Sequence, residues 1–120
     1  MKVAFTASGN TLDSPIDGRF GRARYFMIVD TEDGSVEAVS NEQNLQAPSG
    51  AGVQAAQNVA DSGAKALVTK HCGPKAFSVL SRAGIEVYGT DAGTVAKARE
   101  LFEAGRLERI DSPDVEGHWA

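Results

Sequence analysis

Short apolar runs dominate the first third of the chain, whereas the remainder alternates between apolar runs and segments with helical periodicity. In those later segments apolar residues recur every three or four positions, which is typical of amphipathic helices. The pair Asp33-Gly34 between two early runs predicts a hairpin turn. Strands are therefore expected at residues 3–7, 25–30, 36–39, 66–69 and 85–88. Three helices are expected to begin after Pro48-Ser49, at Pro74 and after Asp91 or Thr94, and to end at Gly63, Arg82 and Gly105.

The order of these elements predicts a single α/β domain. One hairpin precedes alternating helix and strand units, so we expect a mixed, mainly parallel sheet of five strands, with strand two antiparallel and helices on both faces. The 120 residues suffice to bury a core without disulfide bonds or metals. The domain should span residues 1–110, and residues 111–120 should form an irregular tail. Ligands of such sheets bind beyond the carboxyl ends of the parallel strands, where residues from Ser8 onward, 70–73 and 89–91 should meet.

Composition narrows the function classes. The formal charge of −4 argues against general binding to nucleic acid or to acidic membranes. The chain has one cysteine, which cannot form an internal disulfide bond, so a reducing, cytoplasmic compartment is expected. No signal peptide or membrane anchor is recognisable. The average charge hides a local contrast, because arginines crowd residues 19–24 and acids crowd residues 111–116.

Residues 70–75, here called the cysteine turn, join an expected strand to an expected helix with the sequence KHCGPK. Pro74 suits the first helical position, so unbonded N–H groups and the positive end of the helix dipole should face this turn. Two lysines add positive charge. Cys72 and His71 are candidate ligands of a soft metal species. Cys72 is alternatively a reactive thiol or a small packed residue, and one cysteine cannot supply a four-cysteine iron–sulfur site.

Residues 19–24, here called the arginine loop, have the sequence RFGRAR and contain no acid. Guanidinium groups bind multi-oxygen or multi-sulfur anions through several donors, so Arg19 and Arg22 are candidate anion ligands. The alternative is a solvated loop in which Arg24 packs its aliphatic part on the sheet. The arginine loop closes a long polar connection that starts at Ser8, and connections of this length are usually functional or mobile.

Other motifs carry less weight. Residues 50–55 fit the pattern Gly-x-Gly-x-x-Ala, but they do not follow the first strand of a βαβ unit. A helix start with close packing explains these glycines better than a dinucleotide site. His118 and Trp119 are expected to be tail residues without a catalytic role.

Two segments form a more specific combination. One is Phe20-Gly21-Arg22-Ala23 leading to Tyr25-Phe26, and the other is Gly73-Pro74-Lys75-Ala76-Phe77 followed by residues 83–88. Together they resemble the dinitrogenase iron–molybdenum cofactor family over roughly residues 3–107. The resemblance implies a ribonuclease-H-like fold. Some members carry iron–molybdenum cofactor precursors during nitrogenase assembly. The orange-protein group of sulfate-reducing bacteria, which the chain also resembles, holds a molybdenum–copper sulfide cluster without covalent attachment.

The resemblance implies non-enzymatic binding, storage or delivery of an anionic metal–sulfide cluster. The cargo would be a molybdenum–copper sulfide cluster or an iron–molybdenum–sulfur cofactor precursor, and a protein partner would receive it. Such a cluster brings its own sulfide, so cations, backbone N–H groups and apolar walls can hold it without a protein thiolate. A small-anion or nucleotide-binding regulatory module using the same cationic edge is the alternative. The resemblance points to Arg19, Gly21, Arg22, Arg24, Lys70, His71, Cys72, Gly73 and Lys75.

Overall fold

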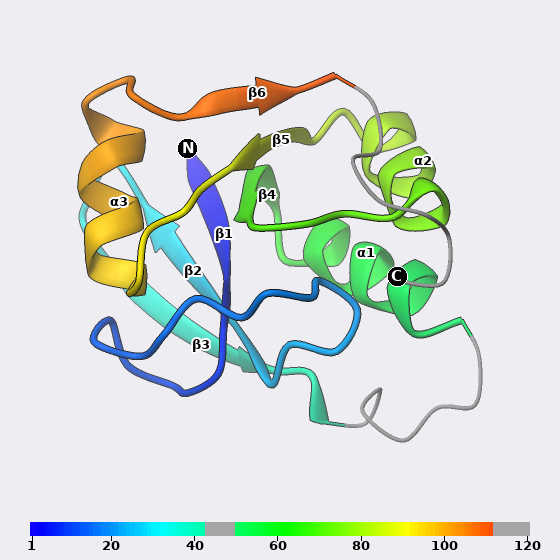
Figure 1. The fold of residues 1–120 in the computed structure, drawn as a ribbon, viewed down its shortest axis with the longest axis horizontal. Coiled ribbons are helices and arrows are strands. Elements are labelled where there is room, and N and C mark those ends of the chain that lie inside the picture. Colours follow the sequence, from blue (N-terminus) through cyan, green and yellow to red (C-terminus); the bar gives the residue numbers. More distant parts are fainter. Residues whose placement is uncertain (43–49, 112–120) are drawn as a thin grey trace.

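The computed structural model describes residues 1–42 and 50–111. Their strands form one mixed sheet in the order β3-β2-β1-β4-β5-β6 (Figure 1). The strands are β1 (Lys2–Ala7), β2 (Tyr25–Asp30), β3 (Val36–Ser40), β4 (Ala64–Thr69), β5 (Glu86–Gly89) and β6 (Glu108–Ile110). The helices are α1 (Ala51–Asp61), α2 (Pro74–Arg82) and α3 (Val95–Glu103). Within the described residues, no helix is long and apolar enough to cross a membrane.

The sheet confirms the predicted mixed α/β architecture but not the predicted strand number. β1, β4 and β5 are parallel neighbours, and β2 is antiparallel to both β1 and β3. The sheet has six strands, not five, because β6 pairs antiparallel with β5. β6 is three residues long and mostly exposed, so its sequence shows no alternation. Its strand conformation depends on a partner that is distant in sequence. Residues 112–120, which make up most of the expected tail, lie outside the described residues, as do Pro48 and Ser49.

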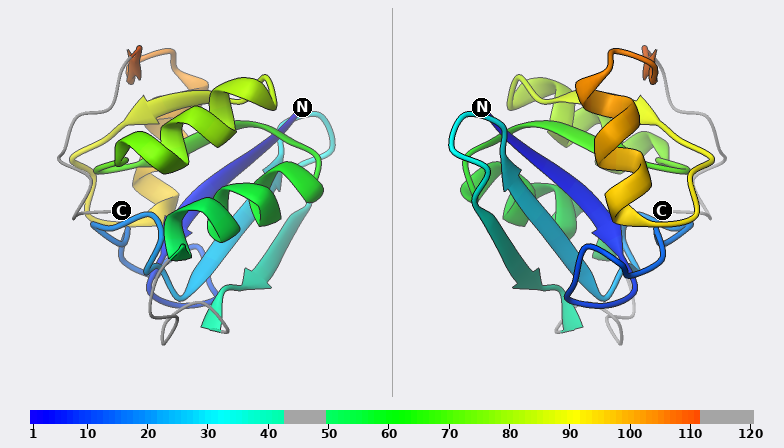
Figure 2. Two further views of the ribbon diagram at one scale, coloured as in Figure 1. Left: turned by 90° about the vertical axis from the view of Figure 1, so that its right-hand side faces the viewer. Right: turned by 90° about the vertical axis from the view of Figure 1, so that its left-hand side faces the viewer.

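Helices cover both faces of the sheet, as predicted (Figure 2). α1 and α2 pack on one face, where the buried cluster includes Phe26, Leu67 and Leu80. α3 packs on the other face against Phe5 and Val68. Gly50 precedes α1 with φ of 77°, a left-handed conformation that favours glycine. This confirms that the glycines of this segment belong to a helix start.

Backbone hydrogen bonds hold the first half of the long connection between β1 and β2. The Ser8 amide donates to the Pro15 carbonyl, and the Ile16 amide donates to the Gly93 carbonyl just before α3. The amide of Val95 in α3 returns a bond to the Ser14 carbonyl. The buried Ile16 side chain joins the α3 side of the core. Backbone hydrogen bonds therefore hold this half of the connection in place, although it contains few apolar residues.

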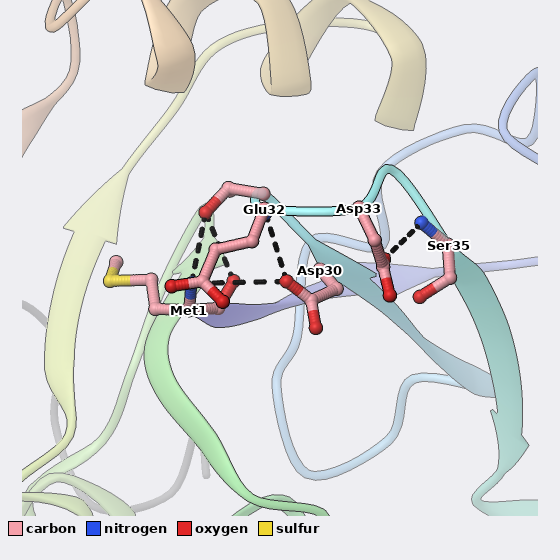
Figure 3. A network of polar contacts seen from close by, with 6 residues as sticks. Met1, Asp30, Glu32, Asp33 and Ser35 are labelled. Carbon is pink, nitrogen blue, oxygen red and sulfur yellow. Dashed lines mark hydrogen bonds and ion pairs between the residues drawn. The ribbon is translucent and has the colours of Figure 1, made fainter.

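The two edges of the sheet described here are the ones at which β1 begins and ends, and they carry different residues. At the edge where β1 begins, the amino group of Met1 lies 3.9 Å from Asp30 Oδ1 and 3.8 Å from Glu32 Oε1 (Figure 3). The Ser35 amide donates to Asp33 Oδ1 in the adjacent hairpin turn, and hydrogen bonds from Ser35 lower the pKa of Asp33. The opposite edge collects the carboxyl ends of β1, β4 and β5, the start of β2 and the end of β3.

Candidate functional site

The apolar residues of the arginine loop are buried, whereas its arginines are exposed or partly exposed. Phe20 and Ala23 are buried, and the Phe20 ring lies 5.4 Å from the ring of Phe26 on β2. Arg19 is exposed and Arg22 is partly exposed. Alternation of buried and accessible residues therefore leaves Arg19 and Arg22 accessible while Phe20 and Ala23 are anchored in the core.

A buried asparagine that the sequence analysis did not identify clamps this loop. Asn41 follows β3 and is fully buried. Its Nδ2 donates to the carbonyl of Ala23 at 2.8 Å and to that of Gly21 at 3.3 Å, and its amide donates to the carbonyl of Arg24 at 2.8 Å. Because these carbonyls lie about twenty residues earlier in the chain, no local sequence pattern marks Asn41 as their partner.

The cysteine turn has the strand-to-helix geometry that the sequence predicts. β4 ends at Thr69, and α2 begins with Pro74 as its first residue and Gly73 as its N-cap. No side chain caps α2, so the first-turn N–H groups lack that partner and the positive helix end faces the edge. Lys75 is exposed and Lys70 is partly exposed. Backbone donors and ammonium groups therefore occur together here.

Cys72 is turned into the protein, whereas His71 is exposed. The thiol side chain is 1% exposed and belongs to the same buried cluster as Phe20 and Ala76. Its Sγ donates to the Gly73 carbonyl at 3.7 Å. This environment favours a packing role for Cys72 over that of a ligand open to an incoming metal. Among the described residues, no group of three or more His, Cys, Asp and Glu side chains is arranged to hold a metal ion.

A buried hydroxyl pair links the strands beneath the site. Thr6 Oγ1 near the end of β1 lies 3.1 Å from Thr69 Oγ1 at the end of β4 and 3.2 Å from the carbonyl of Asp17. The Asp17 carboxylate accepts a hydrogen bond from the Arg19 amide at 3.1 Å. The edge thus combines cations with at least one acid, and its local geometry is set by β1, β4 and the loop between β1 and β2.

Next to the cysteine turn lies a groove of about 810 Å³, here called the β6 groove. Lys70 and His71 line it, together with Lys97 of α3 and Arg106, which precedes β6. Lys70 and His71 are thus the two predicted site residues that line this groove. The arginine loop contributes no residue to its lining, and it belongs to the other side of the cysteine turn, with Cys72 and α1.

The sequence matches the dinitrogenase iron–molybdenum cofactor family over residues 1–105. The chain belongs to this family. The match includes both the arginine loop and the cysteine turn, so the two segments identified from the sequence lie within the family domain. The match ends before β6.

Related proteins cover nearly the whole chain. The apo form of the orange protein from Desulfovibrio gigas is 40% identical, covers 95% of this chain and 96% of its own, and superposes with a TM-score of 0.92. A Thermotoga protein described as NifB-like is 39% identical over 90% of this chain and 91% of its own, with a TM-score of 0.80. An uncharacterised protein of Methanocaldococcus jannaschii is 34% identical over 113 residues, 92% of each chain. The family description names the iron–molybdenum cofactor of dinitrogenase, which suggests a role with a metal cluster or cofactor.

Proposed function

We propose that this protein is a non-catalytic carrier that binds, stores or delivers an anionic metal–sulfide cluster at the carboxyl edge of its sheet. The cargo class is a molybdenum–copper sulfide cluster or an iron–molybdenum–sulfur cofactor precursor, held without covalent attachment. We place this carrier in the cytoplasm, with a second protein as the recipient of the cargo. The proposal includes a ribonuclease-H-like fold for this domain.

The observation that carries this proposal is the pairing of an anchored arginine loop with an uncapped helix start. Arg19 and Arg22 project from a loop whose backbone is held by Asn41, and α2 presents its first turn at the same edge. Guanidinium groups and backbone N–H groups are donors that a sulfide-rich polyanion accepts. The resemblance to the orange protein supports the same class of ligand.

The burial of Cys72 supports a cargo that is held by charge and shape. A thiolate ligand must reach the metal, but the Cys72 thiol is 1% exposed and packed among apolar side chains. The cluster would therefore supply its own sulfide ligands, and the protein would supply cations, N–H groups and apolar walls. His71 is exposed and stays a candidate metal ligand at the margin of the site.

Loading under anaerobic conditions tests the proposal. The protein is mixed with tetrathiomolybdate and copper(I), desalted, and examined by visible absorption and metal analysis. Carrier function predicts a visible band and molybdenum that co-elutes with the protein in a fixed ratio. The alternative, a regulatory module for nucleotides or small anions, predicts no retained colour and saturable binding of ADP or phosphate in calorimetry. That second result would reject the carrier.

A further inference from the structure

The β6 groove brings together cations that are distant in sequence. Lys70 follows β4, Lys97 lies in the first turn of α3 and Arg106 lies just before β6. In residues 1–42 and 50–111, none of these three side chains makes an ion pair. The fold therefore concentrates positive charge in one groove of a chain whose formal charge is −4.

The groove is not uniformly cationic. Asp91 and Glu108 also line it. Arg109 lines it as well, but its guanidinium lies 3.5 Å from Glu86 Oε1 and 3.6 Å from Asp111 Oδ1, so its charge is partly balanced. Among the described residues, the groove cations without an ion pair are thus those on the side that adjoins the cysteine turn and α3.

Most of the remaining lining is apolar, although His71 and Thr90 also belong to it. Leu101 of α3, Leu107 and Ile110 of β6 contribute side chains that are only partly buried, together with the buried Ala92. A groove with apolar walls and cationic groups favours an anion that is large, polarisable and weakly hydrated. A small, strongly hydrated oxyanion would lose its water shell against the leucines without compensation. The volume of about 810 Å³ also greatly exceeds that of one tetrahedral ion.

We propose that the β6 groove is a second anion-binding lobe for a polynuclear metal–sulfide anion, with Lys97 and Arg106 as its binding residues and Lys70 shared with the cysteine turn. This inference rests on the proposed function. It adds residues on the far side of the cysteine turn from the arginine loop. Cargo held by both lobes spans the carboxyl ends of β4 and β5.

The test compares charge-matched double variants. Lys97→Gln with Arg106→Gln neutralises the groove, whereas Lys65→Gln with Arg82→Gln makes the same charge change at the opposite edge. All four side chains are exposed, so folding should be preserved, and circular dichroism verifies it. Each protein is loaded anaerobically with tetrathiomolybdate and copper(I), and protein-bound molybdenum is titrated against salt. We expect the groove variant to bind at least about tenfold more weakly than the control, since it loses two charge-assisted contacts to the anion.

The outcomes separate this inference from the proposed function. If the groove variant binds as well as its control while an Arg19→Gln, Arg22→Gln variant loses binding, the carrier stands and the second lobe is wrong. If the wild type retains no molybdenum, both are wrong. Millimolar inorganic phosphate should not displace the bound anion, and full displacement would overturn the assignment to a soft, polynuclear ligand.

Discussion

The charged groups at the two edges of the sheet differ in whether they form ion pairs within the protein. Where β1 begins, the amino group of Met1 lies between Asp30 and Glu32, and Thr31 closes the network by bonding to the Met1 carbonyl. Where β1 ends, Arg19 makes no ion pair within the part of the chain that the structure describes, nor does Lys70.

The difference shows which edge is available for a ligand. Charges that meet partners within the protein are compensated before any ligand arrives. Cations on anchored loops that form no internal ion pair can still bind an anion. The anchoring also lowers the entropy cost of binding. Substitution of the cations at the carboxyl edge should therefore change ligand retention, whereas substitutions at the other edge should change only stability.

The largest expected effect is on cluster retention by an Arg19→Ala, Arg22→Ala double variant. Charge-assisted hydrogen bonds shielded from water contribute roughly 1.5–3 kcal/mol each, so retention should fall about tenfold or more for each arginine. Molybdenum retained after anaerobic desalting measures this, and the thermal midpoint should stay close to that of the wild type. A Lys65→Ala, Arg82→Ala variant is the matched control. Equal retention by both variants would reject the role of the arginine loop.

The next effect concerns the clamp beneath that loop. Asn41→Ala removes both Nδ2 bonds and leaves two carbonyls of the loop without this partner. Because buried unsatisfied groups cost roughly 1–3 kcal/mol each, we expect a destabilisation of about 2–4 kcal/mol together with weaker cluster retention.

Urea unfolding measures the loss for Asn41→Ala. Asn58→Ala is the control, since the partly exposed Asn58 accepts only a surface bond from Gln54 Nε2. The control should change the free energy of unfolding by less than about 0.5 kcal/mol. A loss at Asn41 no larger than that at Asn58 would show that the loop does not depend on its clamp.

A smaller effect is expected from Cys72→Ser. The hydroxyl can donate to the Gly73 carbonyl as the thiol does, but it is more polar than its apolar surroundings, which should cost roughly 1 kcal/mol of stability. Most cluster binding should remain, because cations and backbone N–H groups are unchanged. Complete loss of colour, together with a metal–sulfur bond to Cys72 in the X-ray absorption spectrum of the wild type, would show that the thiol is a ligand.

The smallest effect is expected at the other edge, for Asp33→Asn. Hydrogen bonds from Ser35 lower the pKa of Asp33 in the folded protein. Its carboxylate therefore stabilises the fold above the pKa of the unfolded state, and this contribution disappears as the pH falls below about 4. Urea midpoints should separate wild type from variant slightly at pH 7 and converge at pH 2. Cluster retention at neutral pH should be identical, and a change in it would break the contrast between the edges.

Sequence reasoning succeeded where neighbouring residues determine the structure. Pro74 and the helical spacing that follows it set the bounds of α2, and Asp33-Gly34 set the β2–β3 hairpin. It failed where the determinants are distant in sequence. β6 is a strand because it pairs with β5. The hydrogen-bond partners of Asn41 belong to another loop.

The candidate site divides in the same way. The arginine loop and the cysteine turn are each continuous in sequence, so residue type and spacing were enough to predict them as candidate segments. The β6 groove draws its cations from three separate elements, and only the sheet order brings these together. Sequence patterns also could not show that Cys72 is 1% exposed, because a strand-to-helix turn is compatible with either orientation of its side chain.

The missed strand has a consequence for self-association. The outermost strands of a sheet expose unpaired N–H and C=O groups that can pair with another molecule. Short, charged outer strands reduce this tendency. β6 covers the outer side of β5 with three residues, two of which, Glu108 and Arg109, are charged and exposed. A chain shortened to end at Gly105 would leave β5, with Val87 and the aromatic ring of Tyr88, as an outermost strand of the sheet. Such a chain would be prone to edge-to-edge aggregation even if its carboxyl-edge loops were intact.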